Sequence, residues 1–426
     1  MSDALRRVAL ISGSRIPFAR SQTSYGSQSN LDMLSAAIEG LVERFDLQGT
    51  QIDEVMAGAV ISHSKDFNLA REAVLSTSLS PLTPGITVQQ ACGTSLQAAL
   101  SLGAKIATGE LDCAIAGGSD TTSDPPIVFG QKFSRRLVNA GAARSAGQRF
   151  KAFKGFSLGE LKPQTPANAE PRTGLSMGEH CERMAREWSI DRESQDRLAV
   201  ESHLKAAKAW DEGFFDDIVQ PWHGLARDNN IRPDSSMEAL AGLKTVFSKR
   251  PDATLTAGNS TPLTDGASAV LLASEDWARE RGLPIQAYIT AGRTAAVDFV
   301  NDEGLLMAPA VAVSELLART SLSLQDFDFY ELHEAFAAQV LCTLKAWASE
   351  DYCRERLGRD EPLGEIDRSK LNMRGSSLAV GHPFAATGAR IVATLGKILE
   401  EAGSGRGLIS VCTAGGMGVA AIMERE

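Results

Sequence analysis

Short apolar runs alternate with amphipathic helical stretches in both halves of the chain, and this alternation limits the fold more than any other feature. In the first half, the strand-like runs 8–11, 52–60, 86–88 and 113–116 are separated by segments with helical spacing of apolar residues or by polar turns. Parallel strands joined by helices are buried on both faces, so they form nearly continuous apolar runs. The sequence therefore predicts an α/β fold around a largely buried sheet.

The second half of the chain repeats this order of elements. An acidic turn leads into a strand within 324–333, as one does within 47–58 in the first half. A helix, the strand 408–411 and a glycine pair then follow one another, as a helix, the strand 113–116 and a glycine pair do earlier. One order of elements in two parts of a chain indicates an internal duplication, and the alternative is that two α/β units look alike by chance.

Residues 121–253 separate these two patterns and lack their rhythm. The segment is richer in charged and turn-forming residues, and helices are predicted in it around 181–188 and 192–210. Core-like sequence resumes at residue 254. We therefore predict an inserted cap over about 121–253.

Composition excludes several classes of protein. The net charge is −10, from 43 Lys and Arg against 53 Asp and Glu, which argues against a general nucleic-acid binder. Six cysteines are too few for a disulfide scaffold, and no Cys-x-x-Cys or His-x-x-x-His pair supports a zinc site. The apolar run 8–11 is too short for a signal peptide, and no run is long enough to span a membrane. We expect a cytoplasmic protein whose thiols stay free for catalysis.

Two cysteines lie where a predicted strand ends. Cys92 occupies a sharp turn between a strand and a helix, and Cys412 ends a buried strand and opens a glycine-rich loop, a similar context. The free N–H groups of a helix N-terminus are expected to lower the pKa of the Cys92 thiol and could hold an oxyanion. The structural alternative is that each cysteine is a small buried apolar residue.

Two histidines lie at similar junctions. His382 is fixed between Gly381 and Pro383 in a turn before a helix, which makes it a candidate general base. His333 and Glu334 end a strand, where ligands gather in α/β sheets. A solvent-facing turn for His382 and helix capping by Glu334 are the structural alternatives. Two thiols and two imidazoles that converge suit thioester chemistry, in which one thiol carries the acyl group and the other moves a proton.

Taken together, these segments resemble the thiolase family over nearly the whole chain. The resemblance rests on the Cys92 turn, the segments 258–267, 331–337 and 381–388, and the Cys412 glycine loop, in that order. Within the family the chain is similar to the thiolase (β) subunits of bacterial fatty-acid oxidation complexes and of the mitochondrial trifunctional complex. That similarity rests on 15–20, on 381–388 and on His333, where many thiolases carry Asn.

The resemblance implies a duplicated fold of two βαβαβαββ halves in five layers, α-β-α-β-α. It implies an N-terminal half over residues 1–276, which contains the insert, and a C-terminal half over 277–426. It also implies the reaction, which is thiolytic cleavage of a 3-ketoacyl-CoA in fatty-acid β-oxidation. No metal or bound cofactor is expected, and coenzyme A is a co-substrate.

The resemblance also assigns roles to the candidate residues. Cys92 is the acyl-accepting nucleophile, and His382 takes its proton and helps to hold the thioester oxygen. Cys412 protonates the departing acetyl-CoA enolate, and His333 orients a water or assists the oxyanion site directly. The backbone N–H groups of Cys92 and Ala414 form a second oxyanion hole, although the family usually has Gly at the latter position. The implied substrate and CoA contacts are Met177, Arg232, Ser260, Thr261 and Phe336.

The insert contains an unusual charge pattern. Residues 125–159 include no Asp or Glu, and five Phe lie among their basic residues. The seven basic residues are Lys132, Arg135, Arg136, Arg144, Arg149, Lys151 and Lys154. The resemblance places the insert over the active site, where basic side chains would suit the phosphates of CoA. A partner subunit, a membrane surface and a solvated basic face remain open as alternatives.

Partners and competing functions also follow from the resemblance. We expect a homodimer or homotetramer, with an α subunit that carries hydratase and dehydrogenase activities. A biosynthetic acetoacetyl-CoA thiolase uses the same residues in the reverse direction. A decarboxylating ketoacyl synthase would use one Cys and two His but would not need Cys412. A non-catalytic lipid carrier on this fold would not need both thiols.

Overall fold

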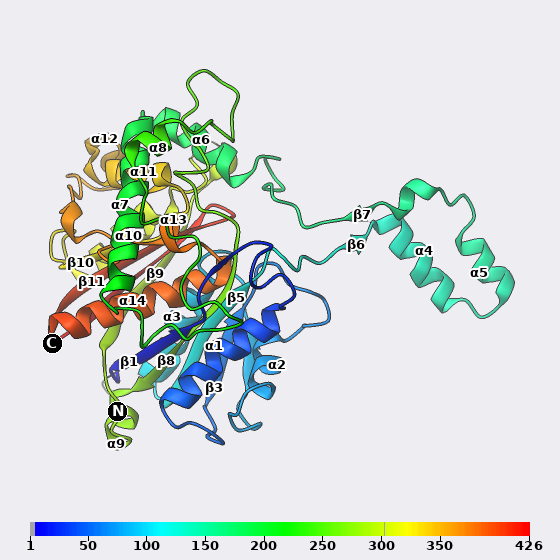
Figure 1. Cartoon of the computed structure of the whole chain (residues 1–426), viewed down its shortest axis with the longest axis horizontal. Helices are drawn as coiled ribbons and strands as arrows, with labels where there is room; N and C mark the ends of the chain where they lie inside the picture. The colour runs from blue at the N-terminus through cyan, green and yellow to red at the C-terminus, as the bar shows by residue number, and fades with distance from the viewer. Residues whose placement is uncertain (1–4, 302) are drawn as a thin grey trace.

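The computed structural model describes residues 5–301 and 303–426 and shows a body of sheets and helices with one long projection (Figure 1). The first half contains β1 (Val8–Arg15), β2 (Ala19–Arg20), α1 (Asn30–Arg44), β3 (Glu54–Gly58), α2 (Leu69–Leu75), β4 (Gly85–Thr87), α3 (Thr94–Ala107), β5 (Cys113–Asp120), β8 (Thr264–Ser274) and α9 (Glu275–Glu280). The second half contains β9 (Ala287–Ala296), α10 (Ala308–Thr320), β10 (Phe329–Leu332), α11 (Ala337–Ala348), α12 (Glu350–Glu355), α13 (Ser377–Val380), α14 (Thr387–Ala402), β11 (Gly405–Thr413) and β12 (Met417–Arg425).

The two halves of the sheet have the same strand order and the same strand directions. In the first half, β3 is parallel to β4 and β5, and β8 is antiparallel to β5 and β1. In the second, β10 is parallel to β11, and β12 is antiparallel to β11 and β9. The counterpart of β4 is a single parallel bridge between Tyr330 and Leu371, so the second half has one strand fewer than expected. Because β1 pairs with β9, the two halves form one continuous sheet. Their shared strand order confirms the predicted duplication.

Helices α3 and α14 form the middle layer between the two halves. They share one apolar core with strands of both halves, including Leu10, Leu96, Ile391 and Val419. Helices α1 and α2 cover the outer face of the first half and α10 and α11 that of the second, each pair with its own core. A Cβ on Gly388 would lie 2.3 Å from the backbone nitrogen of Leu96, so glycine permits the close contact of α3 and α14. The layers therefore follow the predicted α-β-α-β-α order.

The topology corrects one detail of the sequence interpretation. Cys92 precedes α3, whereas Cys412 ends β11, whose counterpart in the first half is β5. The two cysteines therefore occupy different positions of the duplicated unit. The position that corresponds to Cys92 is the loop before α14, which contains His382.

The insert has two parts that behave differently. Helices α6 (Met177–Glu187), α7 (Arg192–Asp211) and α8 (Met237–Ala241) pack on the body, where α6 and α7 contact α11. The second part spans residues 128–164, and we call it the arm. It comprises β6 (Val128–Phe129), α4 (Gln131–Ala142), α5 (Ala146–Ala152) and β7 (Pro163–Gln164). It projects away from the body (Figure 1). The prediction that the insert lies over the active site is therefore wrong for the arm.

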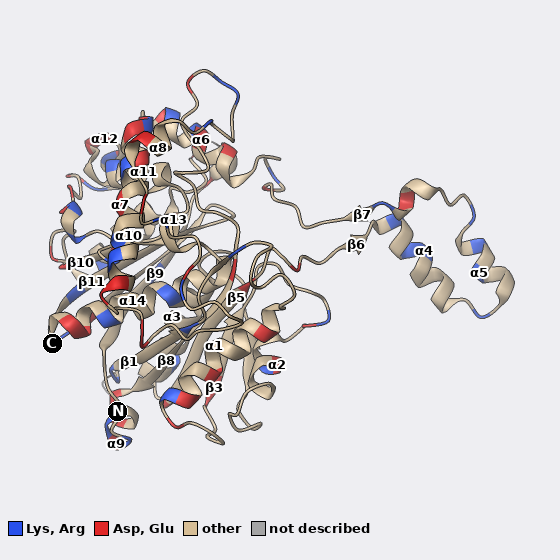
Figure 2. Cartoon of the chain, in the orientation of Figure 1, with Lys and Arg blue, Asp and Glu red and all other residues tan. Residues whose placement is uncertain are grey.

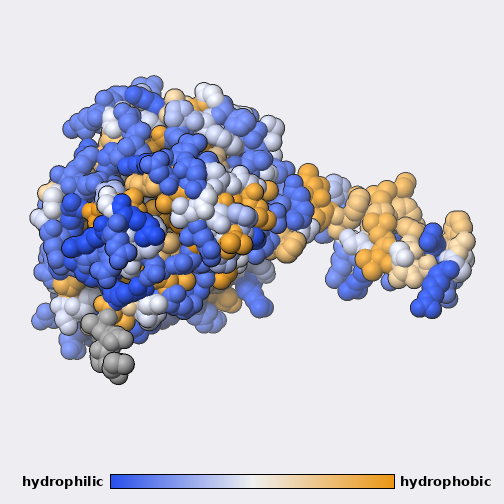
Figure 3. All heavy atoms as spheres, turned by 90° about the horizontal axis from the view of Figure 1, so that it is seen from below, coloured by the Kyte–Doolittle hydropathy of each residue, from blue (hydrophilic) through white to orange (hydrophobic). Residues whose placement is uncertain are grey.

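The arm carries the basic run of the sequence into solvent. Its charged side chains are mostly Lys and Arg (Figure 2), and its surface has a broad apolar face beside them (Figure 3). Neither α4 nor α5 has a buried residue. The arm is held together by packing of Phe133 against Phe153 and Phe156 and by the ion pair of Arg136 with Glu160 at 2.6 Å.

The predicted boundary between residues 276 and 277 falls within α9. Trp277 and Ala278 of that helix pack into the outer core of the first half. The division of the chain at that residue stays a prediction. In the described parts of the chain, no helix combines the length and apolarity needed to cross a bilayer.

Candidate active site

The turn that carries Cys92 is tight and pressed against the second half. Ala91 has a φ of +46°, in the left-handed region that non-glycine residues rarely adopt, so the chain reverses sharply between β4 and α3. A Cβ on Gly93 would lie 2.9 Å from methyl groups of Thr413 and Val419. The absence of that atom lets the turn approach the ends of β11 and β12. The buried side chain of Cys92 therefore lies where the two halves meet.

His382 is hydrogen-bonded to the Cys92 thiol. Its Nε2 lies 3.1 Å from Cys92 Sγ, and its Nδ1 lies 2.6 Å from Thr387 Oγ1. The backbone N–H of His382 donates to Thr264 Oγ1 at 2.7 Å. Three residues on, Ala385 N–H donates to the buried carboxylate of Asp120 at 2.8 Å. The loop that presents the imidazole is thus fixed to the ends of β5 and β8.

His333 lies beside His382 at the end of β10. The centroids of the two imidazole rings are 4.2 Å apart. His333 Nδ1 is 2.8 Å from Ser377 Oγ, and His333 Nε2 is buried without a hydrogen-bond partner among the described residues. One ligand atom each of His333, His382 and Cys92 lie within 4.8 Å of one another. These three side chains could therefore also surround a metal ion such as Zn²⁺, which would occupy the thiol.

The loop after β11 completes the group. Cys412 is buried at the end of this strand, and the backbone N–H of Ala414 acts on the Cys92 thiol in the direction that lowers its pKa. Burial raises the pKa of Cys412 well above its usual value, and the nearby Cys92 raises it further. Gly415 N–H donates to Glu170 of the insert at 2.8 Å, which holds the loop from its outer side. The structure thus brings together Cys92, His382, His333, Cys412 and Ala414.

Burial dominates the protonation of the central pair. Desolvation raises the pKa of Cys92 to about 12, although N–H groups of Ala414 and of Cys92 itself act in the opposite direction. Desolvation, followed by the positive charge of Arg390, lowers the pKa of His382 to about 3. The expectation that the helix N-terminus favours a thiolate at Cys92 is therefore wrong for the resting enzyme, because loss of solvation outweighs the helix dipole. The thiol and the imidazole are both neutral at pH 7.

The predicted substrate contacts form two groups. Ser260 pairs with Phe336 in an antiparallel bridge, and Thr261 Oγ1 donates to the carbonyl of Ala335 at 3.1 Å, so these residues adjoin the segment that follows His333. The hydroxyl of Ser260 is buried and has no hydrogen-bond partner among the described residues. Met177 opens α6, and Arg232 is exposed on the segment before α8. No hydrogen bond or ion pair of the described residues joins Met177 or Arg232 to the Cys92 group.

Glu334 has a structural function that differs from the predicted one. Its carboxylate accepts hydrogen bonds from Ser202 Oγ, Asn372 Nδ2 and the N–H of Leu378, at 2.7, 2.6 and 3.2 Å. Helix α11, by contrast, has Phe336 at its N-cap and no side-chain capping bond. Glu334 therefore ties α7 and α13 to the end of β10 and does not cap the following helix.

Sequence reasoning missed the residues that support the two imidazoles. These residues are Asp120, Thr264, Ser377, Thr387 and Arg390. Asp120 could have been suspected, because it is an acidic residue at the end of an apolar strand. The others are common polar residues, and no spacing rule singles them out.

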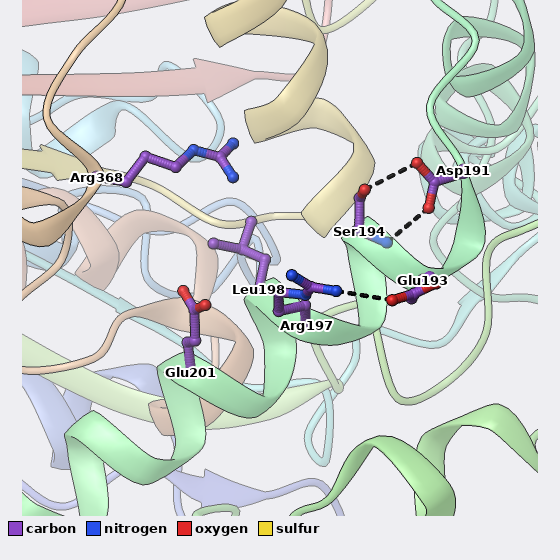
Figure 4. A pocket seen from close by; sticks show the side chains of 7 residues that line it. All are labelled: Asp191, Glu193, Ser194, Arg197, Leu198, Glu201 and Arg368. Atoms are coloured by element: carbon purple, nitrogen blue, oxygen red, sulfur yellow. Dashed lines mark hydrogen bonds and ion pairs between the residues drawn. The ribbon is translucent and has the colours of Figure 1, made fainter.

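A surface pocket beside the first turns of α7 lies apart from this group (Figure 4). It is lined by Asp191, Glu193, Ser194, Arg197, Leu198, Glu201 and Arg368. The bonds of Asp191 to Ser194 cap α7, and Arg197 pairs with Glu193 one turn away. These contacts stabilise the helix, and none of the predicted site residues lines the pocket.

The geometry of the site indicates the kind of reaction that this protein can support. A buried thiol bonded to an imidazole, beside a second thiol, is suited to carry an acyl group, as in an acyltransferase. Residues 8–276 match the family model for the thiolase N-terminal domain, and residues 283–425 match that for the thiolase C-terminal domain. The chain therefore belongs to the thiolase family, and it is an acyltransferase.

Similar proteins cover the whole length of the chain. The 3-ketoacyl-CoA thiolases of Shewanella sp. (strain W3-18-1) and Yersinia pestis (strain Pestoides F) are each 42% identical over 426 residues, with 99% of this chain and 97% of theirs covered. The crystal structure of the Bacillus anthracis acetyl-CoA acetyltransferase matches with a TM-score of 0.83 at 29% identity, with 99% and 100% of the two chains covered. The predicted thiolase fold and family are confirmed.

Proposed function

We propose that this chain catalyses the thiolytic cleavage of 3-ketoacyl-CoA in fatty-acid β-oxidation through an acyl-Cys92 intermediate. The observation that carries the proposal is the 3.1 Å contact between Cys92 Sγ and His382 Nε2. The similarity to 3-ketoacyl-CoA thiolases over the full chain supports it. Acyl transfer needs a thiolate only during attack, and an adjacent neutral imidazole can take the proton at that moment.

The cleavage step uses both thiols. His382 removes the Cys92 proton, and the thiolate attacks the 3-keto carbon of the substrate. The C2–C3 bond then breaks, and its electron pair leaves on C2 as the enolate of acetyl-CoA. Cys412 donates its proton to that carbon, while His382 and His333 hold the thioester oxygen on which the enolate charge develops.

The transfer step regenerates Cys92. The thiol of a second CoA attacks the carbonyl of the acyl-Cys92 thioester, and the N–H groups of Cys92 and Ala414 stabilise the tetrahedral oxyanion. Between the two steps the proton on His382 returns to the Cys412 thiolate, so that neutral His382 can take the proton of the CoA thiol as it attacks. Collapse of the adduct releases the shortened acyl-CoA and the Cys92 thiolate, which takes that proton back from His382. CoA acts as co-substrate, and no step requires a metal or redox group. We propose contacts to CoA and substrate by Met177, Arg232, Ser260, Thr261 and Phe336.

Mass spectrometry of the Cys92 peptide tests the proposal. A 3-ketoacyl-CoA added without free CoA should increase the mass of this peptide by one acyl group, and Cys92→Ala should show no increase. An unmodified Cys92 in the active wild-type protein would contradict the proposal. Cys412→Ala should lose cleavage by about 10²–10⁴-fold but keep acetyl exchange between acetyl-CoA and labelled CoA, because that exchange forms no enolate.

A second candidate function is acetyl-CoA acetyltransferase activity in the condensation direction. The similarity to the Bacillus anthracis enzyme of that name favours it. Turnover of 3-ketohexadecanoyl-CoA and of acetoacetyl-CoA should be compared on the same preparation. Activity confined to acetoacetyl-CoA would favour this candidate over the first.

We also propose an assembly. The enzyme forms a homodimer or homotetramer in the cytoplasm and associates with an α subunit that has hydratase and dehydrogenase activities. The arm, with its exposed apolar and basic side chains, is available for such contacts. Light scattering of the purified chain, alone and with a co-expressed α subunit, measures both associations.

A further inference from the structure

Each of the two active-site histidines contacts a hydroxyl group, and only one of these hydroxyls also contacts a guanidinium. His382 Nδ1 contacts Thr387 Oγ1, and His333 Nδ1 contacts Ser377 Oγ. Ser377 Oγ has a second neighbour, because Arg390 Nη2 donates to it at 2.7 Å. All of these side chains are buried, so their hydrogen bonds have no solvent to replace them.

The guanidinium of Arg390 determines the direction of the Ser377–His333 bond. A guanidinium can only donate, so Ser377 Oγ must accept from Arg390. The hydroxyl proton of Ser377 then has one acceptor among the described residues, which is His333 Nδ1. The opposite arrangement, with His333 Nδ1 as donor, would leave the buried hydroxyl proton without an acceptor.

We propose that Arg390, acting through Ser377, holds His333 in the tautomer that carries its proton on Nε2. This inference deepens the proposed function, because it fixes His333 as an N–H donor to the substrate oxygen. His382 has the other tautomer, since its Nε2 must be free to take the Cys92 proton and its Nδ1–H then donates to Thr387. Adjacent imidazoles thus act as one donor and one base.

The location of the His333 Nε2 fits this assignment. Nδ1 is occupied by Ser377, and Nε2 is buried without a partner beside the Cys92–His382 pair. With a proton there, Nε2 can stabilise the oxygen on which negative charge develops. Without one, its lone pair would repel that oxygen. Arg390 and Ser377 are positioning residues in this scheme, because neither contacts the reacting atoms.

Ser377→Ala removes the hydroxyl that connects Arg390 to His333 and leaves the imidazole and the guanidinium in place. In ¹⁵N-histidine-labelled wild-type protein, His333 should give a pyridine-type Nδ1 signal and a pyrrole-type Nε2 signal, assigned by their loss in His333→Gln. Ser377→Ala should mix or reverse this pattern, and Ser377→Thr should restore it. Ser376→Ala is the matched control, because Ser376 Oγ contacts Arg390 Nη1 and not His333.

Kinetics supply the second readout. Ser377→Ala should lower kcat for cleavage by about 10²–10³-fold with little change in KM, the effect of losing an oxyanion donor. Its Cys92 should react with iodoacetamide at the wild-type rate, because alkylation forms no oxyanion. A pyrrole-type Nδ1 on wild-type His333, or an unchanged kcat in Ser377→Ala, would overturn the inference. Failure of the proposed function would be seen separately, as a wild-type Cys92 that is never acylated.

Discussion

At the scale of single residues, burial sets the resting state of the catalytic pair. The pKa of Cys92 is raised to about 12 and that of His382 is lowered to about 3, in both cases mainly by desolvation. Each shift favours the neutral form of its group, so no thiolate–imidazolium pair forms before substrate binds. In the proposed mechanism, the Cys92 thiolate is therefore generated by proton transfer to His382 during the attack.

Alkylation of Cys92 should follow from this protonation state. Because the thiolate is the reactive form and the thiol pKa lies far above neutrality, the rate with iodoacetamide should rise about tenfold per pH unit between about pH 6 and pH 9. The rate is measured by mass spectrometry of the Cys92 peptide, with Cys113 as an internal control for a second buried thiol. A plateau that begins below pH 7 would instead indicate a preformed ion pair.

At the scale of elements, the site depends on the contact between α3 and α14. Helix α3 follows the Cys92 turn, and α14 follows the His382 loop, so the separation of these helices sets the separation of the Cys92 thiol and the His382 imidazole. The hydroxyl of Ser95 accepts a hydrogen bond from Ala389 N–H at 2.8 Å, and Gly388 allows the backbones to approach. Packing of the middle layer therefore controls the geometry on which the proposed proton transfer depends.

Gly388→Ala should separate these helices. The added methyl group would meet the backbone nitrogen of Leu96 at 2.3 Å, which cannot move aside as a side chain could. We expect a loss of about 1–3 kcal/mol in the free energy of unfolding, measured with urea, and a lower kcat. Gly147→Ala on α5 is the control, since its Cβ would meet no atom within 4 Å and should leave stability unchanged or slightly higher. Equal stability of the two variants would argue against the helix contact.

At the scale of the whole molecule, the arm is a separable structure. Its strands β6 and β7 pair at its base, with Val128 opposite Gln164. Its own aromatic contacts and the Arg136–Glu160 ion pair hold it together, and its helices bury nothing against the body. The active site, by contrast, draws every residue of the Cys92 group from the body.

Replacement of residues 129–163 by a Gly-Ser-Gly linker should therefore leave the body folded. The linker needs only to join Val128 and Gln164, which already face each other in the antiparallel pair of β6 and β7. The midpoint of thermal unfolding should change by less than about 4 °C, and Cys92 should still be acylated by 3-ketoacyl-CoA. A variant that folds but cannot be acylated would show that the arm contributes to the site.

Local sequence pattern was enough to predict the α/β class, the duplication and the junction positions of Cys92, His333, His382 and Cys412. These features depend on local periodicity and on turn residues, which are visible along the chain. The helices around 181–188 and 192–210 were found for the same reason, as α6 and α7.

The environment of these residues could be known only from the packing of the folded chain. The structure showed that desolvation raises the pKa of Cys92 despite the helix N-terminus, that Glu334 ties α7 and α13 to β10, and that the arm projects away from the body. It also placed Ser377 between Arg390 and His333. Burial and hydrogen-bond partners come from segments far apart in the chain, so they depend on the packing of the two halves and cannot be inferred from local sequence pattern.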